Sequence, residues 1–238
     1  MIFNASELGY KKLNNSVREA AGDITVNGCC GERFIGAGSE GKTITINGTP
    51  GNALGAYLNG SVIRVNGNAQ DAVGDTMNDG RIVIYGSAGD ALGYAMRGGS
   101  ILVRDGSGYR TGIHMKQYKD KCPSITVGGS AGSFLGEYLA GGSIIVLGLD
   151  TDGSPVGNFT GTGMHGGEIW LRAAECPDGL PGQVSVKKAE QGELDRIMPR
   201  LEEYSETFGV KMEVILSRPF WLLVPNAKNP YKRLYTVN

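Results

Sequence analysis

The chain has 238 residues, a formal net charge of -1 and 40% hydrophobic residues. This near-neutral balance lacks the electrostatic footprint of a protein that binds nucleic acid or anionic lipid, so we expect neither partner. No apolar run reaches the roughly 20 residues that a membrane helix needs, and the first residues lack the apolar region of a signal peptide, which together predict a cytoplasmic protein. The 39 glycines show no Gly-X-Y period, so they are typical of turns and not of collagen.

Residues 1–21 are expected to form an N-terminal cap. Asn15 or Ser16 is suited to begin a short helix that Gly22 ends, because these residue types are common at helix ends. Such a helix would cover the open end of the repeats that follow it.

Residues 22–172 carry a repeat with a period of 19 residues, seen from Ile63 to Ile82 and from Ile82 to Ile101. A fixed period near 20 is the signature of a solenoid. Two longer intervals, 24 residues before Ile125 and 25 before Ile169, indicate inserted surface loops. The period continues in a column of glycines that we expect to be structural, namely Gly36, Gly55, Gly74, Gly93, Gly112, Gly136 and Gly161.

Three regular columns indicate how the coils stack. Strand side chains alternate, so the repeated isoleucine and the residue two after it share an inward face. A second inward column lies three residues after each glycine and consists of Leu58, Met77, Met96, Met115, Leu139 and Met164. Asn27, Asn47 and Asn66 occupy one corner and suggest an asparagine ladder.

These columns predict an all-β fold, a right-handed parallel β-helix. It would be a single-stranded solenoid with about 19 residues per turn and about eight coils. Leucine-rich and calcium-binding nonapeptide repeats fit less well because their signatures are missing, and the six-residue period of a left-handed helix is missing too.

The outward side chains of the later strands form an apolar stripe of Val83, Leu102, Ile145 and Trp170, which needs a cover. Residues 173–238 are expected to be an appendage packing on the solenoid, with helices over 190–197 and 199–208 and extended segments over 212–216 and 220–224. Segment 220–224 is the favoured cover, and a partner subunit is the alternative. We expect partner contacts at the inserted loops 106–123 and 149–156.

No catalytic, cofactor-binding or metal-ligating residue is predicted for this chain. Its four cysteines, Cys29, Cys30, Cys122 and Cys176, lack the spacing of zinc or iron–sulfur sites. The triplet at 41–43 lacks the context of a phosphate-binding loop. His114 and His165 lie on adjacent turns of the stack, which leaves open an independent enzyme that uses either histidine.

The repeats resemble the C-terminal β-helix domain of the large subunit of glutamate synthase. The resemblance rests on the strings GRIVI at 80–84, GGSIIVLG at 141–148 and NFTGTGMHGG at 158–167, and on a tail with FWLLVP at 220–225 and YKRL at 231–234. It covers nearly the whole chain. A weaker resemblance extends to one of the subunits of formylmethanofuran dehydrogenase.

The resemblance implies a structural subunit of an oxidoreductase complex, inactive by itself. Its partners would be a glutamine amidotransferase subunit and a synthase subunit that holds FMN and an iron–sulfur cluster, and this chain would brace the two. A complex that makes N-methylglutamate from methylamine and a formylmethanofuran dehydrogenase-type complex are the alternatives. The sequence leaves homo-oligomers open as well.

Overall fold

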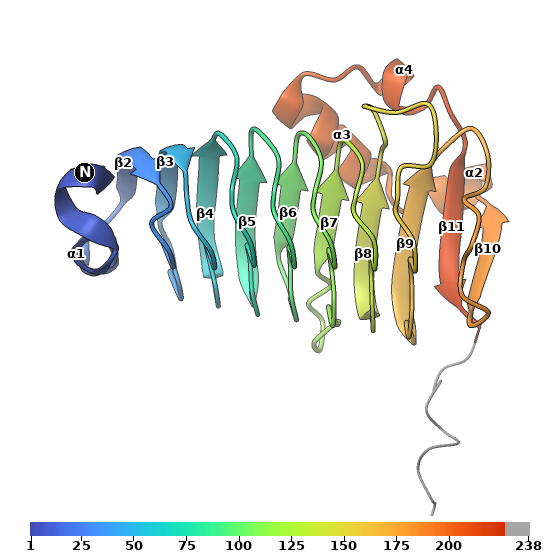
Figure 1. Cartoon of the computed structure of the whole chain (residues 1–238), viewed down its shortest axis with the longest axis horizontal. Coiled ribbons are helices and arrows are strands. Elements are labelled where there is room, and N and C mark those ends of the chain that lie inside the picture. Colours follow the sequence, from blue (N-terminus) through green and yellow to red (C-terminus); the bar gives the residue numbers. More distant parts are fainter. Residues whose placement is uncertain (227–238) are drawn as a thin grey trace, which may run out of the picture.

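The chain forms one long sheet with helices near both ends. The computed structural model describes residues 1–226, which are predominantly β. Figure 1 shows the strands side by side along the long axis. In sheet order they are β1 (Ile2–Asn4), β2 (Asp23–Cys30), β3 (Thr43–Thr49), β4 (Asn59–Asn66), β5 (Asp79–Ile84), β6 (Ser100–Val103), β7 (Ser124–Val127), β8 (Ala140–Val146), β9 (Gly166–Arg172), β11 (Phe220–Pro225) and β10 (Val184–Lys188).

Strands β1 to β9 pair in parallel, each with the next strand along the chain. The repeated isoleucine lies directly opposite its own copy on the next strand, as with Ile44 and Ile63 or Ile82 and Ile101. The two long intervals keep this register, because Ile101 pairs with Ile125 and Ile144 with Ile169. The predicted parallel stack of coils is therefore confirmed, while its right-handed sense stays a prediction.

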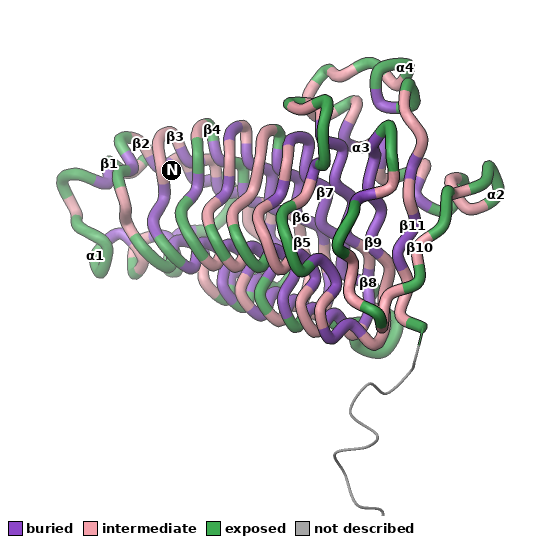
Figure 2. Tube along the Cα trace, turned by 45° about the vertical axis from the view of Figure 1, so that its right-hand side comes forward, coloured by how far each residue is buried: buried purple, intermediate pink, exposed green. Residues whose placement is uncertain are grey.

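The interior is filled by two stacked columns of apolar side chains. The repeated isoleucines are at most 2% exposed, and every member of the leucine and methionine column is 0% exposed. Figure 2 shows the buried segments recurring in coil after coil along the stack. Because a fully buried aliphatic side chain contributes about 1.5–3 kcal/mol, these columns are the main source of stability.

A turn built around the glycine column precedes each strand from β3 to β9. The column glycines have φ between 63° and 75°, and residues two positions before and after also have positive φ, as at Ala53 and Tyr57 around Gly55. The Gly55 N–H donates to Ile35 O of the preceding coil at 2.9 Å, whereas the Ala53 N–H donates to Asp71 O of the following coil at 2.9 Å. The alternating backbone thus bonds each coil to both neighbours.

Each column glycine also faces an isoleucine or valine of a later strand at close range. A Cβ at Gly112 would lie 2.3 Å from Ile144 Cδ1 and 3.2 Å from its Cγ1, and one at Gly55 would lie 2.8 Å from Ile82 Cδ1. Real Cβ atoms do not approach carbon so closely. Glycine is therefore needed both for its φ and for the space that the isoleucine fills.

The predicted asparagine ladder is present. Asn47 Nδ2 donates to Asn27 Oδ1 at 2.7 Å, and Asn66 Nδ2 donates to Asn47 Oδ1 at 2.7 Å. The side-chain amide of each coil thereby hydrogen-bonds to that of the neighbouring coil, which fixes the corner of the first three coils.

The N-terminal cap differs from the prediction. Helix α1 (Ala5–Glu19) starts well before Asn15 and Ser16, so the predicted start is wrong. Buried Leu13 and Val17, four residues apart, set the helix face that packs on the end of the core, and this packing outweighs the capping preference of the polar residues. Strand β1 pairs with β2, so the sheet begins before the expected boundary at residue 22.

The C-terminal appendage contains α2 (Gln191–Leu194), α3 (Met198–Phe208) and α4 (Met212–Ile215). The helix predicted over 199–208 is confirmed, and Gly209 ends it with φ 70°. Of the helix predicted over 190–197 only the single turn of α2 is helical, and residues 195–197 form a turn. The extended segment predicted over 212–216 is wrong, because it forms the turn of α4. Its buried Ile215 packs with the side chains beneath the appendage, and the local helical turn makes that contact.

Helix α3 covers the apolar stripe. Val83, Leu102, Ile145 and Trp170 are all at most 2% exposed. Tyr204 of α3 donates its hydroxyl to Arg104 O at 2.8 Å, and Glu203 lies 3.2 Å from Arg81 Nε at the first covered strand. The cluster beneath the appendage consists of Ile145, Leu147, Trp170, Ile197, Leu201, Tyr204, Ile215, Phe220 and Leu222.

The favoured cover, segment 220–224, is extended as predicted but has a different place. As β11 it pairs antiparallel with both β9 and β10 and continues the sheet, so α3 and not this strand crosses the stripe. Its side chains continue both faces of β9, because Leu223 packs in the interior and Leu222 beneath the appendage. The YKRL part of the tail at 231–234 lies outside the described residues.

The glycine column generates a first prediction. We expect Gly112→Ala to lower the free energy of unfolding by about 2–5 kcal/mol, because it adds a left-handed strain of about 1–2 kcal/mol to an overpacking cost of about 1–3 kcal/mol. Gly38→Ala is the matched control, since Gly38 has φ 65° and a Cβ added there would meet nothing within 4 Å. Urea unfolding of both variants measures the difference, and equal losses would contradict the contact.

The covered stripe generates a second prediction. We expect Ile145→Asp to destabilise the fold by more than about 4 kcal/mol, because an unpaired carboxylate would lie beneath α3. Thr45 occupies the same outward register position on β3 and is half-buried, so Thr45→Asp should change stability by less than about 1 kcal/mol. Thermal or urea unfolding compares the two, and a stable Ile145→Asp protein would show that α3 does not seal this face.

Candidate functional site

The turns of the glycine column present large side chains to solvent. Phe34, Tyr57 and Phe159 lie two residues from a column glycine, have φ near 60° and are 48%, 58% and 54% exposed. A left-handed backbone disfavours bulky residues, and glycine would adopt it without strain. We define the aromatic turn face as Phe34, Tyr57, Tyr94, His114, Phe134, Tyr138 and Phe159.

Rings of the aromatic turn face pair with each other between coils. His114 stacks on Tyr138 with centroids 5.0 Å apart, and Tyr94 meets the His114 ring edge-on at 5.9 Å. Phe134 and Phe159 are stacked at 4.9 Å. These contacts hold exposed rings in fixed positions, as expected of a preorganised binding surface.

Charged groups border the second ring pair. The Arg110 guanidinium lies 5.0 Å from the centroid of the Phe134 ring and 3.0 Å from Glu137 Oε2. Glu137 comes from the same turn as Phe134, and Arg110 comes from the turn of the preceding coil. The face therefore combines apolar rings with a fixed ion pair, a composition typical of protein interfaces.

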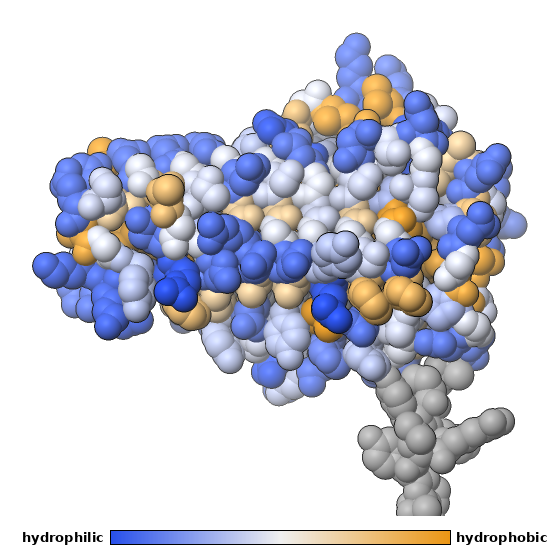
Figure 3. All heavy atoms as spheres, viewed as in Figure 1, coloured by the Kyte–Doolittle hydropathy of each residue, from blue (hydrophilic) through white to orange (hydrophobic). Residues whose placement is uncertain are grey.

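Figure 3 shows how apolar and hydrophilic residues are distributed on the surface in the view of Figure 1. Apolar residues along the coils form narrow rows between hydrophilic ones.

The two histidines lie in different surroundings. The contacts of His114 are to the tyrosine rings of the aromatic turn face. His165 is half-buried, and its Nδ1 lies 3.2 Å from Gly163 O. A histidine that acts as a general base forms a hydrogen bond to the hydroxyl or thiol of a nucleophile, and neither of these contacts is such a bond.

The cysteines are separate free thiols. Burial raises the pKa of Cys29 to about 12, and the hydrogen bond to Glu32 and its charge add to the effect, so the thiol stays protonated at neutral pH. Cys30 and Cys122 are exposed, and burial also raises the pKa of Cys176. Within residues 1–226, no group of three or more His, Cys, Asp or Glu side chains is placed to hold a metal ion.

The inserted loops are tied to other parts of the chain, the first to strand β5 and the second to the C-terminal appendage. In the first loop, Tyr118 and Lys121 exchange backbone hydrogen bonds, and Lys121 Nζ forms an ion pair with Asp79 Oδ2 at 2.8 Å. In the second, the Thr151 carbonyl accepts a bond from Arg218 at 2.9 Å. Their role as partner contacts stays a prediction.

A groove runs beside α3 along the starts of the later strands. Its larger part has a volume of about 510 Å³ and is lined by Gly141, Gly142, Gly167 and the arginines Arg196 and Arg200, among other residues. The charge of Arg196 is neutralised by Glu168 at 2.6 Å. The rest of the lining includes the apolar side chains of Ile197 and Val224, so the groove has a mixed polar and apolar lining.

Sequence reasoning did not identify the aromatic turn face. A signal for it was present in the sequence, because most of its large residues recur two positions before or after the column glycines.

In the described residues, no helix is long and apolar enough to cross a membrane.

Comparison with known proteins identifies the family. A family model described as the GXGXG motif matches residues 6–224, which confirms the resemblance drawn from the repeats. The uncharacterized protein MJ1350 of Methanocaldococcus jannaschii is 40% identical over an alignment of 251 residues that includes gaps. The alignment covers 99% of this chain and 96% of that protein.

A solved structure shares the fold. It is a chain of the formyltransferase/hydrolase complex (FhcABCD) from Methylorubrum extorquens, crystallised in complex with methylofuran. The two chains are similar with a TM-score of 0.60 and 20% identity over 82% of this chain and 70% of that chain. The family model matches almost the entire chain, and the stacked glycine turns agree with it. The chain therefore belongs to the GXGXG motif family.

Proposed function

We propose that this chain is a non-catalytic structural subunit of a glutamate synthase-like complex. The observation that carries the proposal is the family match, which covers residues 6–224. The chain would brace a glutamine amidotransferase subunit against a synthase subunit. FMN and an iron–sulfur cluster would belong to the synthase subunit.

The aromatic turn face supports a scaffold role. Phe34, Tyr57 and Phe159 occupy strained left-handed positions although about half of each residue is exposed, so burial in the core does not account for their bulk. Strain of this kind persists where binding uses it. We place the contact with one of the two partner subunits on this face.

A second candidate is a subunit of a formyltransferase/hydrolase-type complex. The structural similarity to a chain of such a complex favours it, with a TM-score of 0.60. At 20% identity this likeness concerns the fold, so the family match over 6–224 weighs more. A methylamine-glutamate N-methyltransferase complex would use the chain in the same bracing role.

Purification of the tagged chain from its native cells tests the complex. We expect it to co-purify with an amidotransferase subunit and an FMN-containing subunit. With glutamine, 2-oxoglutarate and a reductant supplied, the assembly should form glutamate from 2-oxoglutarate only when this chain is present. Formyl transfer by the purified assembly would instead establish the second candidate. Turnover by the isolated chain that is lost in His165→Ala would contradict both and favour an independent enzyme.

A variant of the aromatic turn face separates binding from folding. We expect Phe159→Gly to change stability by less than about 1 kcal/mol, because relief of the left-handed strain at φ 62° offsets the loss of the stacking contact with Phe134. Loss of an exposed interface ring should weaken assembly at least about tenfold. Tyr10→Ser on α1, where the ring is 39% exposed, is the control and should assemble normally. Normal assembly of Phe159→Gly would remove this face from the interface.

A further inference from the structure

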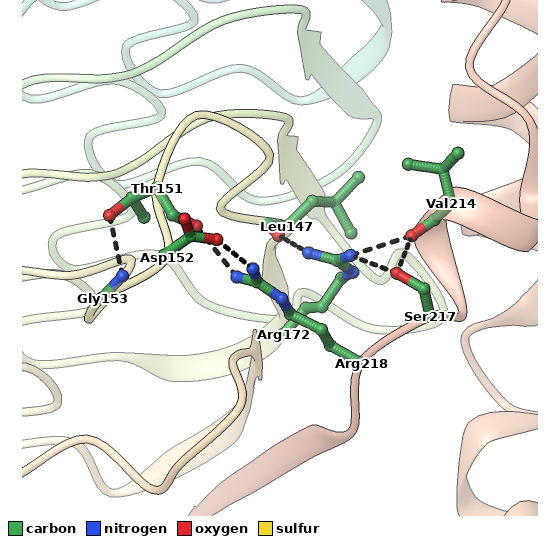
Figure 4. A network of polar contacts seen from close by, with 8 residues as sticks. All are labelled: Leu147, Thr151, Asp152, Gly153, Arg172, Val214, Ser217 and Arg218. Atoms are coloured by element: carbon green, nitrogen blue, oxygen red, sulfur yellow. Dashed lines mark hydrogen bonds and ion pairs between the residues drawn. The ribbon is translucent and has the colours of Figure 1, made fainter.

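A buried arginine near the end of the sheet has no carboxylate partner within residues 1–226. Arg172 ends β9 and is 4% exposed. Its Nε donates to Ile215 O at 2.7 Å. Its Nη1 donates to Leu147 O at 3.1 Å, and its Nη2 donates to Val214 O and to Ser217 Oγ, both at 2.8 Å (Figure 4). All four acceptors are neutral oxygens. The contacts hold α4 in place and leave the positive charge without a carboxylate.

A second arginine lies beside the first. Figure 4 shows the guanidinium of Arg218 next to that of Arg172 and facing Asp152. Burial lowers the pKa of Arg172, and the like charge of Arg218 lowers it further. The contacts with α4 explain why Arg172 is buried. They do not explain why Arg218, a second positive charge, lies next to it.

The carboxylate that faces Arg218 is held only at the surface. Asp152 forms an ion pair with Arg218 Nη2, and its side chain is 97% exposed. An exposed pair of this kind contributes only about 0–1 kcal/mol. Asp150 is engaged elsewhere, because its two oxygens accept bonds from the Ser130 N–H at 3.1 Å and hydroxyl at 2.8 Å. Asp152 is therefore the carboxylate that a competing anion displaces.

Both arginines line a cavity large enough for a small anion. The cavity has a volume of about 250 Å³, and its wall is formed by Arg172, Arg218, Val214 and the loop from Gly148 to Asp152. Nη1 of Arg172 makes one hydrogen bond to Leu147 O and carries a second N–H. A guanidinium pair presents planar donors that match a carboxylate.

We propose that this cavity, the arginine pocket, is a binding site for a carboxylate group. The incoming carboxylate takes the place of Asp152 on Arg218 and sets a negative charge beside Arg172. It is either a free small carboxylic acid or a glutamate or aspartate side chain of a docked protein. The proposal does not depend on which complex the chain joins.

Titration of the isolated full chain with acetate tests the pocket. At constant ionic strength, we expect saturable shifts of the side-chain Nε–H resonances of Arg172 and Arg218 in NMR spectra. Arg218→Gln should weaken binding at least about tenfold, since a charge-assisted bond is lost. Asp152→Asn should tighten it about twofold to fivefold, because the competing carboxylate is removed.

Arg196→Gln is the matched control, since it removes one arginine that is paired with Glu168 outside the pocket, and it should leave acetate binding unchanged. Titration with N-acetylglutamate amide identifies the source. Binding at least about tenfold tighter than acetate indicates a protein side chain, and equal binding indicates a free acid. Shifts that do not saturate, that persist in Arg218→Gln, or that chloride or inorganic phosphate reproduces equally would overturn the carboxylate site.

Discussion

The close contact between each column glycine and an aliphatic side chain of a later strand is the constraint on which the stack depends. At Gly112 the Ile144 side chain occupies the space where any other residue would place its Cβ. The same glycines have the left-handed φ that lets the turn send N–H groups to both neighbouring coils. One residue type thus satisfies the backbone and the packing at once, so the isoleucines remain in register even across the two inserted loops.

A rigid stack of this kind separates the roles of its faces. The outer face of the later strands is closed by α3 and α4, which leaves the aromatic turn face, with its paired rings, as an exposed apolar surface in the part of the chain that the structure describes. The appendage also brings Arg218 beside Arg172, so the cover that seals the stripe forms the arginine pocket at its edge. The two surfaces lie on one scaffold whose shape is set by the coils, which fits the proposed bracing role.

The periodic part of the molecule could be predicted from the sequence, because in-register stacking repeats the same environment every 19 residues. The 19-residue spacing alone predicts that Ile63 pairs with Ile82 and that Asn47 bonds to Asn66. The rest depends on contacts between distant segments that have no period. Helix α1 starts early because Leu13 and Val17 meet the core end, and Arg218 meets Thr151 from a position 67 residues away. The aromatic turn face carried a spacing signal, but only the φ values show that its rings occupy strained positions.

The contact between Gly112 and Ile144 offers the most direct measurement of the central claim. Ile144→Val removes the Cδ1 atom that a Cβ at position 112 would meet at 2.3 Å, and by itself it should cost about 0.5–1.5 kcal/mol. Urea unfolding of Gly112→Ala, Ile144→Val and the double variant forms a double-mutant cycle. We predict that the double variant is less destabilised than the sum of the single variants by at least about 1 kcal/mol, since the clash is relieved. Additivity within about 0.3–0.5 kcal/mol would show that glycine is required there for its backbone alone.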